Sequence, residues 1–139
     1  MNNILIFKTS SENVLIKLFE DLKDIKGKKY CLIQSSLIKI FQKKYADIEF
    51  LDIQQEGFYN VSQDIMSSIK QKYFDKVYIP ATGPRPTNFG NILKIVNDLD
   101  CGEIVFYNCS GEEKTVKRKS KLEEKFIRGY IKLVQFFYR

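Results

Sequence analysis

Hydroxyl side chains follow the first apolar run of the chain, in a loop that opens onto a stretch with helical periodicity. The run is residues 4–7, and Thr9, Ser10 and Ser11 come shortly after it. Hydroxyls at a helix N-terminus can cap the helix or contact an anion, because free backbone N–H groups and the helix dipole favour negative charge there. Helix capping alone and anion binding are therefore both open for this loop.

An arginine between prolines is the second feature with binding chemistry. Residues 80–91 hold all three prolines of the chain, and two of them flank Arg85, the only arginine among residues 1–113. Proline fixes its own φ and favours extended backbone before it, so Arg85 is expected on a stiff segment, where a guanidinium suits phosphate or carboxylate. Thr87 or Asn88 would cap the next helix and add backbone donors. The alternative is a rigid connection whose arginine faces solvent.

Several catalytic classes are disfavoured by what the sequence lacks. It has no histidine, no GxGxxG after an expected strand and no Walker A motif, and no acidic residue closes the second expected strand. Ser-His and Cys-His pairs, the usual catalytic zinc sites and a dinucleotide dehydrogenase are therefore disfavoured, and no metal site is expected. Whether the chain is an enzyme is undecided by its sequence. The acid or base candidates near expected loop ends are Glu12, Asp52, Glu56 and Glu112.

Alternating strands and helices must position these residues. The expected strands are residues 3–8, 29–34, 48–53, 76–80 and 103–108, and the expected helices are residues 11–26, 37–45, 61–73, 88–99 and 121–139. The first and last of these strands are apolar on both faces, which is typical of a parallel sheet covered by helices on both sides. The predicted fold class is α/β, a three-layer Rossmann-like or flavodoxin-like domain with a five-stranded parallel sheet.

The strand order decides whether the two loops meet. Ligands of open parallel sheets bind beyond the carboxyl ends of the strands, where the order reverses. The reversal lies between strands one and four in a 3-2-1-4-5 order and between strands one and three in a 2-1-3-4-5 order. If strands one and four are neighbours, the loops with Thr9 and Arg85 face each other across one crevice.

Length and composition describe an ordinary globular chain. Its 139 residues suit one domain, and 44% of them are hydrophobic. No apolar stretch approaches the roughly 18 residues of a membrane span, and the start of the sequence does not resemble a signal peptide. The cytoplasm is the expected compartment, with the inner face of the membrane as a further place of action. Three cysteines without CxxC spacing are expected as buried, reduced thiols.

Positive charge is concentrated at the end of the chain. Residues 1–113 have a net charge of -1 and residues 114–139 a net charge of +7. We therefore divide the chain into a Rossmann-like domain, residues 1–113, and a basic loop with an amphipathic C-terminal helix, residues 114–139, which either completes that domain or docks on a membrane or partner. A homo-oligomer is also open, whereas nucleic acid is disfavoured because no base-stacking platform accompanies the charge. The expected contact residues are Lys117, Arg118, Lys119, Lys121, Lys125, Arg128 and Lys132.

The opening of the sequence resembles a known family. Residues 4–11, with Lys8, Thr9, Ser10 and Ser11 after an apolar strand, are similar to the start of heptosyltransferase-like glycosyltransferases, where this loop is followed by Gly-Asp. The resemblance implies one half of a two-domain GT-B fold, in which the aspartate serves as the base. This sequence continues without Gly-Asp, so Glu12 would have to replace that base.

The resulting functional prediction is a glycosyltransferase-like Rossmann domain that binds a phosphorylated or nucleotide-type ligand, a nucleotide or nucleotide sugar, and is incomplete as a catalyst alone. One alternative is a non-catalytic interaction module that acts through its basic C-terminal helix. A further alternative is a flavodoxin-like FMN-binding protein, with Phe58, Tyr59 and Phe89 beside the flavin.

Overall fold

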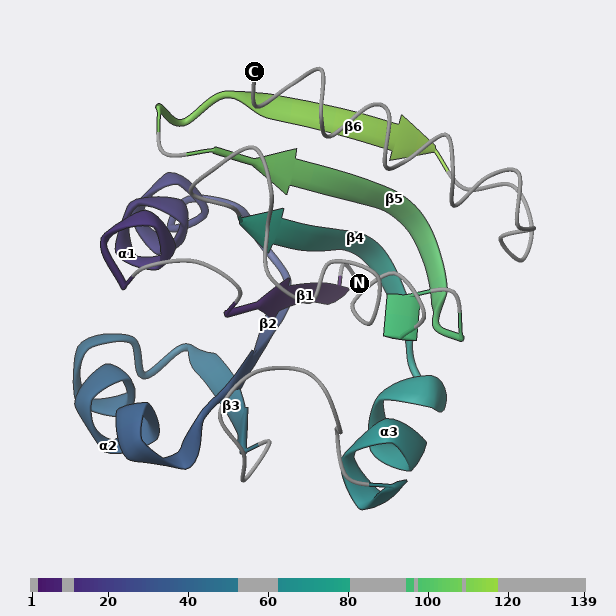
Figure 1. Cartoon of the computed structure of the whole chain (residues 1–139), viewed down its shortest axis with the longest axis horizontal. Helices are drawn as coiled ribbons and strands as arrows, with labels where there is room; N and C mark the ends of the chain where they lie inside the picture. The colour runs from purple at the N-terminus through teal and green to yellow at the C-terminus, as the bar shows by residue number, and fades with distance from the viewer. Residues whose placement is uncertain are drawn as a thin grey trace.

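The computed structural model describes residues 3–8, 12–52, 63–80, 95–96, 98–108 and 110–117 (Figure 1). Strands and helices alternate along most of this part of the chain. The elements are β1 (Asn3–Phe7), α1 (Glu12–Asp21), β2 (Lys28–Ile33), α2 (Ser35–Lys44), β3 (Ile48–Asp52), α3 (Gln63–Lys70), β4 (Tyr73–Pro80), β5 (Asp100–Tyr107) and β6 (Glu113–Lys117). No helix in this part of the chain has the length and apolar character needed to cross a bilayer.

The strands form one sheet of six in the order β3-β2-β1-β4-β5-β6. The first five pair in parallel, and β6 runs antiparallel to β5. The predicted α/β class is confirmed, and the architecture is compatible with a Rossmann-like fold. The prediction of a purely parallel, five-stranded sheet is wrong, because β6 adds an antiparallel edge. The 2-1-3-4-5 order is also ruled out, since β3 lies beside β2 alone among the described strands.

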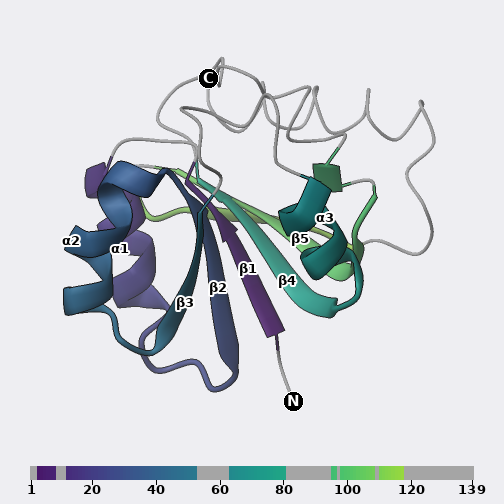
Figure 2. The same ribbon diagram turned by 90° about the horizontal axis from the view of Figure 1, so that it is seen from below.

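Strand β1 is central because both of its faces are apolar. Successive side chains of a strand point to opposite faces, and those of β1 enter two different hydrophobic clusters. Ile4 and Ile6 join the cluster that contains α1 and α2, while Leu5 and Phe7 join the one that contains α3. All four are at most 2% exposed. Helices therefore cover both faces of the sheet, with α1 and α2 on one side and α3 on the other (Figure 2).

Helix spacing and aromatic contacts hold the α1 and α2 layer on the sheet. The buried residues of α1 repeat at helical spacing and form one stripe against the strands. Phe19 at the end of that stripe makes edge-to-face contacts with Phe41 of α2 and Phe50 of β3, each with ring centroids 6.0 Å apart. Such pairs add about 0.5–1.5 kcal/mol each beyond their buried area.

A tight turn at Asn108 produces the antiparallel strand. Oδ1 of Asn108 accepts hydrogen bonds from the backbone N–H groups of Ser110, at 3.0 Å, and Glu112, at 2.9 Å. Gly111 has a φ of +80°, which glycine adopts without steric cost. The chain therefore reverses, and β6 pairs with β5 along residues 113–117. The first residues of the predicted basic loop are thus part of the sheet, and the position 113/114 at which we divided the sequence lies inside β6.

Candidate functional site

The residues predicted to bind a ligand lie outside the described part of the chain, and so do most of the predicted docking residues. Glu12 is described, and it is the exposed first residue of α1. Lys117 ends β6. Outside the described residues are Thr9, Ser10, Ser11, Arg85, Thr87 and Asn88 of the predicted ligand site, and Arg118, Lys119, Lys121, Lys125, Arg128 and Lys132 of the predicted docking surface.

The structure does establish how the strands that lead into the two ligand loops are arranged. β1 and β4 are parallel neighbours, with Ile4 opposite Lys76 and Ile6 opposite Tyr78. β2 and β3 extend from one side of this pair and β5 and β6 from the other, so the strand order reverses between β1 and β4. Neighbouring strands lie about 4.8 Å apart. The loops that follow Lys8 and Pro80 therefore leave the sheet from adjacent strand ends at its carboxyl edge.

Three polar residues lie at the carboxyl ends of β2 and β3: Gln34 and Ser35 follow β2, and Asp52 is the last residue of β3. Ile33 pairs with Asp52 at the ends of these strands. The hydroxyl of Ser35 donates a 2.5 Å hydrogen bond to Oδ1 of Asp52. Gln34 is the N-cap of α2, makes no side-chain capping bond, and has a buried Oε1 without a hydrogen-bond partner. An acceptor that is buried without a hydrogen-bond partner costs about 1–3 kcal/mol.

The sequence predictions missed this group as a unit. Asp52 is one of the four acid or base candidates near expected loop ends, whereas Gln34 and Ser35 are not among the predicted site residues. A carboxylate does lie near the end of β2, and it belongs to Asp52 of the neighbouring strand β3. The run of polar residues directly after an apolar strand was the available signal, and it gave no indication of the partner strand.

The carboxyl end of β5 carries a polar contact that is structural. The hydroxyl of Tyr107 donates a 2.5 Å hydrogen bond to Oδ2 of Asp21, at the end of α1. Burial, and then this carboxylate, raise the pKa of Tyr107 well above its usual value. Burial followed by the charges of Glu113 and Glu103 raises the pKa of Tyr78 to about 12. Both phenols therefore stay neutral near pH 7 and do not act as bases there.

Two of the three cysteines, Cys31 and Cys101, are buried and in the reduced form, as the sequence predicted. Burial raises the pKa of Cys31 far above its usual value, and the nearby charge of Lys8 opposes this only partly. The thiolate is the nucleophilic form of cysteine. Cys31 is consequently an inert core residue.

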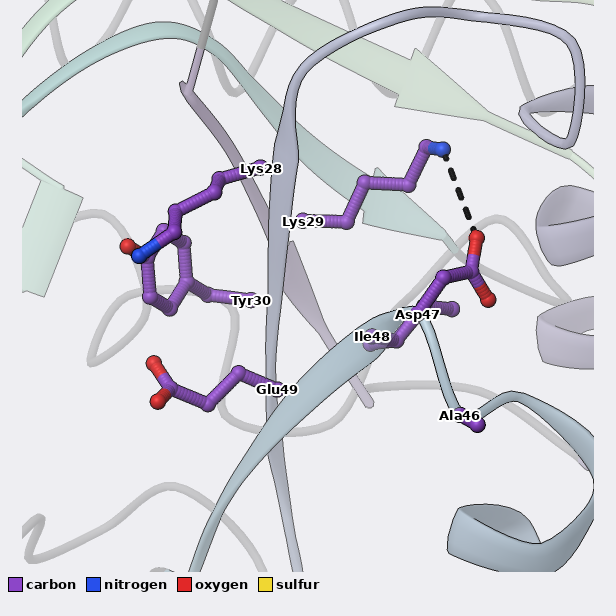
Figure 3. Close-up of a pocket in the computed structure, with 7 residues that line it drawn as sticks. All are labelled: Lys28, Lys29, Tyr30, Ala46, Asp47, Ile48 and Glu49. Atoms are coloured by element: carbon purple, nitrogen blue, oxygen red, sulfur yellow. Dashed lines mark ion pairs between the residues drawn. The ribbon is translucent and has the colours of Figure 1, made fainter.

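A hollow of about 320 Å³ lies at the opposite edge of the sheet (Figure 3). Lys29, only 6% exposed, has its Nζ 3.8 Å from Oδ2 of Asp47 there. This hollow is at the amino ends of β2 and β3, away from the edge where open parallel sheets bind ligands. Its lining residues are Lys28, Lys29, Tyr30, Ala46, Asp47, Ile48 and Glu49.

Metal binding finds no support in the described residues, which contain no group of three or more His, Cys, Asp or Glu side chains able to hold an ion. The chain matches no protein-family model, no curated protein and no solved structure in the comparisons made. Its class is therefore stated from its own architecture, an α/β domain with a mixed, mostly parallel sheet of six strands.

Proposed function

We propose that this chain is a Rossmann-like domain that binds a phosphorylated or nucleotide-type small molecule at the carboxyl edge of β1 and β4. One observation carries the proposal: β1 and β4 are parallel neighbours, and the strand order reverses between them. Such a reversal is where open α/β sheets bind ligands, because the loops on its two sides diverge to opposite faces.

The loops that leave these strands have the chemistry for an anion. The segment Thr9, Ser10 and Ser11 leads into the N-terminus of α1, where hydroxyl and backbone donors meet the positive end of the helix dipole. In the proposal, Arg85 follows β4 and contributes a bidentate guanidinium, while Thr87 and Asn88 add further donors. A phosphate between the two loops would be contacted from both.

A narrower proposal follows from the resemblance of residues 4–11 to heptosyltransferase-like glycosyltransferases. In this version the phosphorylated ligand is a substrate of glycosyl transfer, and a second Rossmann-like domain is needed to complete the reaction. Glu12 is the residue that would serve as base, since it opens α1 directly after the loop. In an assembly that includes the second domain, replacement of Glu12 by glutamine should abolish transfer, while ligand binding by this chain stays intact.

The binding proposal is tested by thermal unfolding of the intact chain with a panel of ADP, UDP, a nucleotide sugar, FMN and inorganic phosphate. A ligand at 100 times its Kd adds about 2.7 kcal/mol of stability, which corresponds to a rise in Tm of about 10 °C. The variant Arg85→Ala should lose this rise. Lys26→Ala is the matched control, because it removes the same charge from an exposed residue just before β2, at the other edge of the sheet.

A shift retained in Arg85→Ala would contradict the proposed role of that arginine. No shift with any member of the panel would overturn the proposed function. A shift with FMN alone, together with a yellow purified protein, would favour the flavin alternative over the nucleotide one.

A second proposal places an interaction surface in residues 114–139, which carry a net charge of +7. The supporting observation is that β6 joins this segment to the edge of the sheet and exposes Lys114 and Thr115. Basic residues near anionic lipid contribute about 1 kcal/mol each. Truncation before Ser120 should abolish sedimentation with vesicles containing phosphatidylserine. Sedimentation of the truncated chain would contradict this proposal.

A further inference from the structure

Two adjoining hollows at the amino ends of β2 and β3 share one buried lysine. The hollow of about 320 Å³ described above and a second one of about 380 Å³ are both lined by Lys29, Asp47 and Ile48. Pockets that hold small molecules have volumes of about 300–1,000 Å³, so the second hollow is large enough for one. Its other lining residues come from the last turns of α1 and α2 and the residues just after them: Phe19, Glu20, Lys23, Lys44 and Tyr45.

The side chain of Lys29 is buried along its stem and reaches the surface at its ammonium. Lys29 is only 6% exposed, whereas its neighbour Asp47 is 66% exposed and lies at the mouth of the hollows (Figure 3). The distance from Nζ of Lys29 to Oδ2 of Asp47 is 3.8 Å, which is too long for a hydrogen bond. The ammonium therefore has N–H donors to offer to another acceptor.

The charges around the second hollow favour a ligand with a single negative charge. Three ammonium groups and two carboxylates line it, those of Lys23, Lys29, Lys44, Glu20 and Asp47. The lining therefore has one positive charge in excess, which a monoanion would neutralise. A dianion such as a phosphate monoester would be repelled more strongly by the two carboxylates and by the negative C-terminal ends of α1 and α2.

The uncharged wall of the second hollow is aromatic and aliphatic. Tyr45 is half-buried, and its ring contacts Phe19 edge-to-face with centroids 4.9 Å apart and stacks on Phe41 at 6.4 Å. Its hydroxyl donates a 3.1 Å hydrogen bond to Glu20. These contacts hold the Tyr45 ring in place beside Ile48, so a ligand ring can pack against a fixed surface.

We propose that the second hollow is a binding site for a small aromatic monocarboxylate. Lys29 binds the carboxylate, Lys23 and Lys44 add positive charge at the rim, and Tyr45 packs against the ring. The site lies at the amino edge of the sheet, opposite to the ligand site proposed at β1 and β4, and either site can exist without the other.

The test titrates the intact, isotope-labelled chain with phenylacetate, benzoate and cinnamate and follows the backbone amide signals by NMR. For at least one of these acids, we expect the amides of Lys29 and of residues 44–48 to shift with a single Kd. The matched controls for phenylacetate are acetate, which lacks the ring, and phenylacetamide, which lacks the charge. Each should bind at least about tenfold more weakly.

Three results of this titration would overturn the proposal. The first is that none of the acids shifts these amides at millimolar concentration. The second is that phenylacetamide binds as tightly as phenylacetate. The third is that phenyl phosphate binds more tightly than phenylacetate, since the site would then prefer a dianion.

Variants of the lining residues test which groups make the site. Lys29→Met removes the ammonium and keeps an unbranched apolar stem, so it should weaken binding of the best acid about tenfold. Asp47→Asn should strengthen binding, because it removes the carboxylate that competes for Lys29. Unchanged affinity in a folded Lys29→Met would overturn the proposal.

A second pair of variants separates ligand binding from the ordinary role of lysines at a helix C-terminus. Lys43 and Lys44 are adjacent, exposed and in the last turn of α2, so both complement the helix dipole, but only Lys44 lines the hollow. Lys44→Met should weaken binding about threefold, and Lys43→Met is the matched control that should leave it unchanged. Equal affinities in these two variants would overturn the proposal even if Lys29→Met fails to fold.

Discussion

Tyr107 and Asp21 are joined by a 2.5 Å hydrogen bond that connects the end of β5 to the end of α1. The phenol ring is fully buried, whereas the carboxylate lies at the surface. α1 follows β1 in the chain, so this bond ties the first half of the sheet to the second. Hydrogen bonds to charged acceptors contribute more than neutral ones, about 1.5–3 kcal/mol.

Replacing Tyr107 with phenylalanine should therefore lower the free energy of unfolding by about 1–2 kcal/mol, near the lower end of that range because Asp21 can be solvated after the change. Urea unfolding measures this loss. Tyr45→Phe is the comparison, since its hydroxyl donates a 3.1 Å hydrogen bond to Glu20 in an exposed setting. Tyr45→Phe should lower the free energy of unfolding by less than Tyr107→Phe does. Equal decreases in the two variants would show that burial does not strengthen the hydrogen bond of Tyr107.

Stability should fall in alkaline solution. Burial raises the pKa of Cys31, Tyr78 and Tyr107 in the folded protein. The unfolded chain then loses these protons at lower pH than the folded one, so folding stability is complete below the unfolded pKa values and declines as the pH rises towards the folded ones. Tyr78 has a pKa of about 12 in the folded protein and 10.0 in an ordinary setting. Its contribution to the stability of the fold therefore begins to fall near pH 10.

Between its unfolded and its folded pKa, each tyrosine lowers the free energy of unfolding by about 1.4 kcal/mol per pH unit. Urea midpoints measured between about pH 8 and pH 11 should decline above pH 9, where Cys31 starts to contribute. The decline should be shallower in Tyr107→Phe. A flat profile to pH 11 would mean that these groups titrate alike in the folded and unfolded chains.

Gln34→Met should stabilise the ligand-free protein. The change removes a buried oxygen that has no hydrogen-bond partner and keeps the approximate size of the side chain. Because such an oxygen costs about 1–3 kcal/mol, we expect the free energy of unfolding to rise by about 1 kcal/mol. Gln42→Met at the surface should stay within about 0.5 kcal/mol of wild type. A loss of stability in Gln34→Met would reveal a structural bond to this side chain.

Gly111→Ala should destabilise the turn before β6. Its φ of +80° costs an L-residue about 1–2 kcal/mol, and the new Cβ would lie 3.0 Å from Cε of Lys17. The lysine side chain is flexible, so backbone strain is expected to dominate. The double variant Lys17→Ala with Gly111→Ala should keep most of the loss. If the double variant instead regains the stability of the wild type, the loss in Gly111→Ala comes from the steric contact with Lys17.

The buried thiols should resist modification. Cys31 and Cys101 are inaccessible in the fold, so in a Cys109→Ser background a disulfide reagent such as Ellman's should react only as fast as the protein unfolds. Adding urea should then release two thiols together. Rapid reaction of either thiol in the native protein would contradict its burial.

The sequence predicted β1, β2 and β3 to within one residue at each end, because each is an apolar run bounded by polar residues. It placed the end of the third helix too late. Tyr73 continues the helical spacing from Ile69, yet the helix ends at Lys70 and Tyr73 opens β4, where it pairs with Asp100. Local periodicity fits both states, and pairing with a strand 27 residues further on decides between them.

Other differences have the same cause. The lysines after Glu113 resemble a solvated loop, and only the turn at Asn108 and Gly111 indicates a hairpin. The contact of Ser35 with Asp52 depends on the register of β2 against β3, which a single sequence does not contain. The adjacency of β1 and β4 was one of two open orders, and the structure selects it.

The central place of β1 has a consequence for synthesis on the ribosome. Its first partner, β2, emerges soon after it, but β4 follows some 70 residues later, about 4–14 s at ordinary elongation rates. Throughout that interval Leu5 and Phe7 lack the α3 side of their cluster, including Val77 and Ile79 of β4. During this interval the nascent chain therefore exposes an apolar face of the incomplete sheet to solvent. We expect it to need a chaperone until β4 has been synthesised.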